Sequence, residues 1–154
     1  MGVQNNSNES VVIEQSMLDF LNTWSDKPVA EIKIDELDKK ALSMMFQPLA
    51  GTKKVKKYVN GSYSGEFPFA VYVRTPNLDT KHKLDARKIL NSLDEWFSKK
   101  NDKKELVNLP NLSGNNIATK IEMTSTPSIA CRYDNGTDDY QAIFSLSYKH
   151  KEEK

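Results

Sequence analysis

Cysteine, histidine and long apolar runs are scarce in this chain of 154 residues, and each scarcity excludes a class of protein. The single cysteine, Cys131, excludes an internal disulfide and any metal site built from several cysteines. No apolar run approaches the roughly 20 residues that a membrane-spanning helix needs. The polar first ten residues lack the basic and apolar regions of a secretory signal peptide. These absences predict a soluble, intracellular protein without a membrane partner.

Side chains that could carry catalysis are also few. The two histidines, His82 and His150, lie in no pattern typical of a triad or a metal site, so both are expected to be solvated. Cys131 lies in a predicted strand and is expected to be a small apolar core or sheet residue. Adjacent carboxylates such as Asp138 and Asp139 point in different directions, make poor acid–base dyads and are expected on the solvated surface. No glycine-rich phosphate-binding loop is present. The sequence therefore predicts no enzyme, no metal site and no cofactor.

The composition is that of one ordinary globular domain. Hydrophobic residues make up 38% of the chain and charged residues 28%. Lysine and arginine number 22 against 21 acids, a net charge of +1 that disfavours a nucleic-acid binder driven by bulk charge. We expect a flexible leader over residues 1–9, a single domain over 10–149 and a flexible charged tail over 150–154.

Two amphipathic helices are predicted from apolar residues at helical spacing. The first covers about residues 10–25 and ends before Pro28, because the residue before a proline avoids the helical region. The second covers about residues 79–99, with Asn77 or Asp79 as its cap. Its apolar stripe is Ala86, Ile89, Leu90, Leu93, Trp96 and Phe97.

Two Asn-Gly turns predict two antiparallel hairpins, since both residue types tolerate a positive φ. Asn60-Gly61 joins strands expected at 53–59 and 62–75, and Asn135-Gly136 joins strands expected at 128–133 and 138–148. Shorter strands are expected at 31–34, 41–49 and 117–124. The alternating residues Phe67 and Phe69, and then Tyr140 and Phe144, should each share one face of their strand.

The prolines and the order of elements complete the predicted fold. Pro68 cannot donate to a ladder, so its strand should have an edge or a bulge there, and Pro127 should break the strand that contains it. Short hairpins imply antiparallel pairing. The predicted class is α+β, a mostly antiparallel (mixed) sheet with two main helices packed on one face.

A run of four lysines, Lys53, Lys54, Lys56 and Lys57, is the only marked local charge feature. In a strand these side chains alternate between faces, so they cannot all line one groove. Two interpretations stay open. Lysine on an edge strand blocks unwanted pairing with other strands. Alternatively, the lysines contact phosphate within a larger assembly, for example DNA in a lumen.

Two stretches of sequence, residues 58–97 and 111–148, resemble the tail-terminator or minor capsid proteins of phages and prophages of Gram-positive bacteria. The more diagnostic pieces are NGSY followed by FPFAVYVR, the pattern LDAxxxLNxLxEW at 84–96, and TPSxxxRxDNGxxDYQAxFxLxY at 126–148. Together the two stretches cover roughly half of the chain. Their motifs are structural, so the resemblance supports the fold directly and the role by association.

The resemblance implies an α+β subunit, made in the host cytoplasm, that assembles as a hexameric ring in the virion. Such a ring caps the head-proximal end of the tail tube, stops its polymerisation and presents a surface to a head connector, completion protein or sheath. DNA passes through the lumen only transiently. No catalytic residue is implied, and the matching residues have turn and core roles. These are Asn60, Gly61, Phe67, Phe69, Leu90, Leu93, Trp96, Asn135, Gly136, Tyr140 and Phe144.

Two alternatives remain open at this stage. A head–tail connector or head-completion protein of similar size would leave normal-length tails without heads when deleted. A small regulatory or ligand-binding domain would have a deep apolar pocket with convergent polar groups, and no residues nominate one. The connections at 39–52 and 100–116 are long enough to become ordered against a neighbouring subunit.

Overall fold

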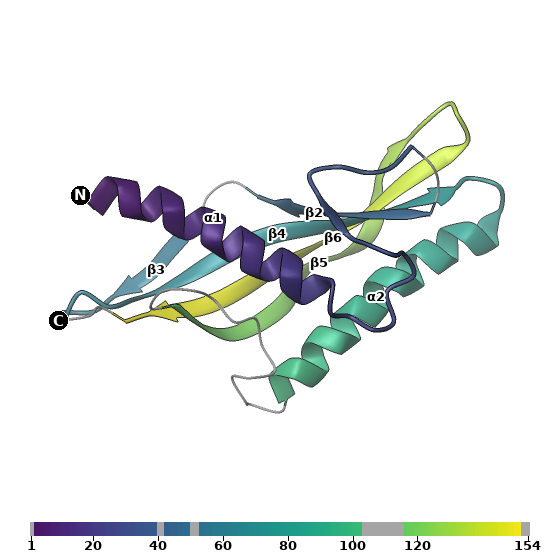
Figure 1. Cartoon of the computed structure of the whole chain (residues 1–154). Coiled ribbons are helices and arrows are strands. Elements are labelled where there is room, and N and C mark those ends of the chain that lie inside the picture. The colour runs from purple at the N-terminus through teal and green to yellow at the C-terminus, as the bar shows by residue number, and fades with distance from the viewer. Residues whose placement is uncertain (1, 40–41, 50–52, 103–115, 152–154) are drawn as a thin grey trace.

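The computed structural model describes residues 2–39, 42–49, 53–102 and 116–151 (Figure 1). It confirms the predicted α+β class, with two helices and a mixed sheet. The elements are α1 (Gly2–Leu21), β1 (Lys33–Ile34), β2 (Ser43–Pro48), β3 (Lys53–Lys57), β4 (Tyr63–Pro76), α2 (Thr80–Asp102), β5 (Asn116–Arg132) and β6 (Thr137–His150).

The sheet is built around two long central strands. Its order is β1-β2-β4-β6-β5, and β3 pairs with β4 beside β2. β1 and β2 are parallel, whereas the other pairs are antiparallel. β4 and β6 pair along their whole length, from Tyr63 opposite His150 to Pro76 opposite Thr137. Both helices lie over one face of this sheet, and no helix of the described residues lies over the opposite face (Figure 1).

The core lies between the helices and the sheet. Phe97 on α2 contacts Phe144 on β6 and Phe69 on β4, with ring centroids 5.1 and 6.3 Å away. Phe20 of α1 stacks on Trp96 of α2 at 4.7 Å, which holds the two helices together. The predicted core residues are buried, apart from Ile89 and Trp96 of the α2 stripe, which are only partly buried. Fully buried members are Phe67, Phe69, Leu90, Leu93, Tyr140 and Phe144.

The helix limits differ from those predicted. α1 begins at Gly2, so the residues expected as a flexible leader form its first turns, and it ends at Leu21 instead of near residue 25. Asn22 explains the early end, because its side-chain amide donates to the carbonyls of Leu18 and Ile32 and its oxygen accepts from the Ile32 amide. α2 begins at Thr80, and Asp79 caps it as predicted, by accepting the backbone N–H of His82 at 3.0 Å.

The two prolines behave differently. Pro68 lies between the part of β4 that pairs with β3 and the part that pairs with β2. Its carbonyl accepts from the Leu49 amide, so its missing N–H falls at a local gap in pairing, one of the two predicted situations. The prediction that Pro127 breaks its strand was wrong. β5 continues through it at the sheet edge, and a register shift between Ser125 and Ser128 accommodates it.

Both predicted Asn-Gly hairpins are confirmed. Gly61 and Gly136 adopt φ angles of 91° and 89°, which glycine tolerates without strain. The Asn60 side-chain oxygen accepts the amide of Ser62, and Asn135 accepts the amide of Thr137 in the same way. The Asn and Gly residues of the two turns therefore set the register of the hairpins that the turns close.

Gly65 lies under the ring of Tyr148, its cross-strand partner on β6. A Cβ at this position would lie 2.5 Å from the Tyr148 Cζ atom, and Tyr148 is only 2% exposed, so the ring has little room to move. We expect Gly65→Val to lower the free energy of unfolding by about 2 kcal/mol, measured by urea denaturation. Ser64→Val, on the adjacent and partly exposed position, is the matched control. Equal stability of the two variants would contradict the close approach.

Candidate interaction surfaces

The described part of the chain contains no group of three or more His, Cys, Asp or Glu that could hold a metal ion. Within the same residues, no helix is long and apolar enough to cross a membrane. The histidines are less solvated than expected. His82 Nδ1 lies 2.6 Å from Asp79 Oδ1. His150 belongs to β6 and not to a tail. Its ring stacks on Tyr63, and its Nδ1 lies 2.9 Å from the Asn116 side-chain oxygen.

The hydrogen bond at the start of α2 also changes a pKa. The Asp79 carboxylate accepts the backbone N–H and then the ring N–H of His82, and these bonds lower its pKa. A lowered carboxyl pKa means that this cap stabilises the fold above the unfolded pKa and is lost as the pH falls through the folded value. The role of this carboxylate is structural, since it closes the first turn of the helix.

Asp138 and Asp139 are buried, which corrects the expectation that they are solvated. Their side chains face opposite sides of the sheet, so the expectation that they form no dyad is retained. Asp139 receives a forked pair of hydrogen bonds from Arg74, Nε at 2.8 Å and Nη2 at 3.0 Å. Asp138 pairs with Arg132, whose Nε lies 3.2 Å away. Burial is tolerated because each carboxylate has an arginine partner.

Tyr133 extends the Asp139 cluster to the end of the β5–β6 hairpin. Its hydroxyl donates to Asp139 at 2.9 Å, and the Arg74 guanidinium lies 5.1 Å from the centre of its ring. Hydrogen bonds to Cys131 and to Asp139 raise the pKa of Tyr133 to about 12. The hydrogen bond from Arg74 to Asp139 also raises the pKa of the guanidinium. This cluster holds the hairpin end on the helix-free face.

Cys131 lies in β5, as predicted, but it is exposed and does not join the core. It is paired with Asp139, and therefore it points to the helix-free face of the sheet. Of the two predicted positions, a core residue or a sheet residue, the structure shows the second, because alternation along a strand does not indicate which of the two faces a helix covers.

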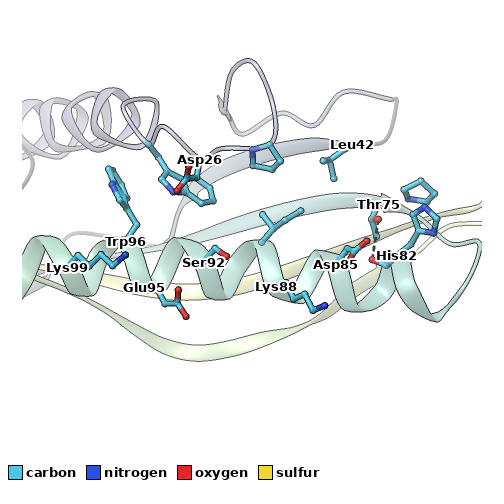
Figure 2. A pocket seen from close by; sticks show the side chains of 14 residues that line it. Asp26, Leu42, Thr75, His82, Asp85, Lys88, Ser92, Glu95, Trp96 and Lys99 are labelled. Atoms are coloured by element: carbon cyan, nitrogen blue, oxygen red, sulfur yellow. Dashed lines mark hydrogen bonds between the residues drawn. The ribbon is translucent and has the colours of Figure 1, made fainter.

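A groove follows the flank of α2 (Figure 2). Its volume is about 790 Å³. Figure 2 shows α2 as one wall, with Asp26 and Leu42 across from it on the segments that connect α1 to β2. The apolar lining consists of Trp24, Pro28, Leu42, Pro76, Ile89 and Trp96, and the polar lining of Asp26, Thr75, His82, Asp85, Lys88, Ser92, Glu95 and Lys99. The groove was not predicted, because residues from four separate segments build it.

Both outer edges of the sheet run along the surface. β5 forms one edge over 17 residues, and side chains near its end, Ile129 and Tyr133, are 41% and 38% exposed. β1 and β3 form the other edge. Among the described strands, neither β5 nor β3 has a second partner. Backbone groups on such edges can pair with another chain.

The lysine run forms β3, whose backbone pairs with the first residues of β4. Lys57 is exposed, whereas the side chains of Lys53, Lys54 and Lys56 lie outside the described part of the structure. A hollow of about 550 Å³ lies beside this strand, at the Asn60-Gly61 turn and the end of β6. Of the predicted connections, most of that at 39–52 is described and contains β2, whereas that at 100–116 falls largely outside the described residues.

Comparison with known proteins identifies no family. No protein-family model matches the chain, and no curated protein does. One solved structure, whose name states no function, is similar over 93% of this chain and 96% of its own, with 14% identity and a TM-score of 0.47. That likeness is too distant to support an argument about fold or function.

Proposed function

We propose that this protein is a tail terminator, a structural subunit that forms a hexameric ring on the head-proximal end of a phage tail tube. The observation that carries the proposal is a sheet that, within the described residues, has two open edges and helices on one face only. The sequence resemblance over residues 58–97 and 111–148 supports it, because these stretches include β4, β5 and most of α2 and β6.

Ring formation follows from the position of the two edges. A contact between β5 of one subunit and the β1–β3 side of the next joins two different surfaces, and such contacts close into a ring when the rotation is right. Closure covers edges that would otherwise continue to pair. The terminating activity is then geometric, since the ring binds the tube on one side and offers no site for further tube subunits on the other.

Deletion of the protein should give phage tails of uncontrolled length, with unattached heads where the particle has heads. Ile129→Lys should give the same result, because it places a charge on the exposed β5 edge. Val11→Lys, at an exposed position on α1, is the matched control and should leave tail length unchanged. Negative-stain electron microscopy measures the tail lengths, and circular dichroism checks that both variants fold.

Tails of normal length without heads would contradict the terminator and assign the protein to the head–tail connector. Particles unaltered by the deletion would contradict both virion roles. The groove beside α2 would then favour a ligand-binding domain, because its tryptophan and isoleucine walls provide apolar surface next to several polar groups.

A further inference from the structure

Positive charge is concentrated at one end of a chain that is nearly neutral as a whole. β3, the turn after it, the start of β4 and the end of β6 together span residues 53–66 and 147–151. These residues include six of the 22 basic side chains and one of the 21 acidic ones, Glu66, and two further acids, Glu152 and Glu153, follow directly in the sequence. We call this region the basic end. Its charge is therefore local and is not visible in the net charge of +1.

Strand pairing assembles the basic end from distant parts of the sequence. Tyr63 of β4 is paired with Lys57 on one side and with His150 on the other. Ser64 is likewise paired with Lys149 of β6. Lys57, Lys149 and Lys151 are all exposed, so their ammonium groups are accessible from solvent. Lysines at two corners of the sheet therefore flank the same short segment of β4.

The hollow at this end has a lining suited to an anion. It lies between the Asn60-Gly61 turn and the last residues of β6, with Lys149 and Lys151 in its wall. The other lining residues supply hydroxyl, amide and imidazole groups next to Tyr58 and Val59. No acidic residue lines it among the residues described. Phosphate oxygens are the acceptors that such a set of cations and neutral polar groups attracts.

We propose that the basic end binds the phosphate backbone of double-stranded DNA without reading its sequence. Lysine is a compact charge that neutralises phosphates, whereas base recognition depends on forked or amide side chains placed in a groove. The one amide at the turn, Asn60, already accepts the Ser62 amide and holds the turn. The inference rests on the proposed ring function, because a ring that surrounds a DNA channel brings this partner to the protein.

The contact is weak and salt-dependent by its nature. Each phosphate neutralised by a lysine contributes about 0.9 to the slope of log affinity against log salt concentration. A handful of such contacts lets DNA slide along the surface and does not hold it in one register. That behaviour is compatible with a channel through which DNA must pass.

Fluorescence anisotropy with a labelled 25-base-pair duplex tests the proposal on the full chain. The triple variant Lys57→Gln, Lys149→Gln and Lys151→Gln should reduce the affinity at least tenfold at low salt. It should also make the slope of log affinity against log salt concentration shallower by about 2 to 3. The matched control is Lys81→Gln, Lys88→Gln and Lys99→Gln, which removes three exposed lysines from α2 and should change the affinity less than twofold.

Two results would overturn the proposal. One is a wild-type protein that shows no salt-dependent binding of the duplex, and the other is an α2 control that loses as much affinity as the basic-end variant. Tighter binding to polyglutamate than to DNA would also overturn it, in favour of an acidic protein partner. Tail length in particles carrying the basic-end triple variant is a separate readout. Normal lengths there, with DNA binding lost, would leave the terminator function standing.

Discussion

Replacing Asp139 by alanine is expected to lower the free energy of unfolding by about 3 kcal/mol, measured by urea denaturation. The change removes both acceptors of the forked Arg74 contact and the acceptor of the Tyr133 hydroxyl. The Arg74 side chain is only 16% exposed, so its charge would be left largely desolvated without a carboxylate partner. One backbone contact would remain, from Arg74 Nη1 to the Asp38 carbonyl.

A matched control separates the buried pair from a general effect of removing an acid. Asp134→Ala removes an exposed carboxylate from the neighbouring turn and should change stability by less than about 0.5 kcal/mol. The double variant Asp139→Leu with Arg74→Met should recover most of the loss, because no unpaired charge remains. If the double variant were as unstable as Asp139→Ala, the unpaired guanidinium would not be the cause.

Phe144→Ala is expected to cost about 3–5 kcal/mol of unfolding free energy. The Phe144 ring is fully buried between the sheet and α2, stacked on Phe69 at 5.5 Å and meeting Phe97 edge-on at 5.1 Å. Alanine would leave a cavity where a strand and a helix meet, and two other rings would lose their contact.

The same denaturation experiment supplies the control for the core. Ile129→Ala, on the exposed edge of β5, removes a comparable apolar side chain and should cost less than about 0.5 kcal/mol. A loss below 1 kcal/mol for Phe144→Ala, close to that control, would show that α2 does not depend on this ring.

The elements that local chemistry specifies were predictable from the sequence. Asn60-Gly61 and Asn135-Gly136 both form turns, and the apolar stripe of α2 packs on the sheet. Asp79 caps α2 because its carboxylate reaches a backbone amide only three residues away. These signals are short-range, so a single sequence contains all the information that they need.

The features that were missed depend on distant partners. Asp139 was expected on the surface because Arg74, which neutralises it, lies 65 residues away in the sequence. Whether Cys131 joins the core could not be predicted either, because the position of α2 decides which face of its strand is covered. The parallel pairing of β1 with β2 gave no sequence signal either, since it involves two short segments with no shared turn.

The full-length pairing of β4 with β6 has a kinetic consequence. The two hairpins, β3–β4 and β5–β6, each close on their own Asn-Gly turn, so their contacts are local. The pairing of β4 with β6, the seam between the two hairpins, joins residues as far apart in the sequence as Tyr63 and His150. Closing so long a loop costs entropy before any seam contact forms, and folds dominated by distant contacts are slow. We therefore expect the docking of two preformed hairpins, with α2 closing over the seam, to set the folding rate of this protein.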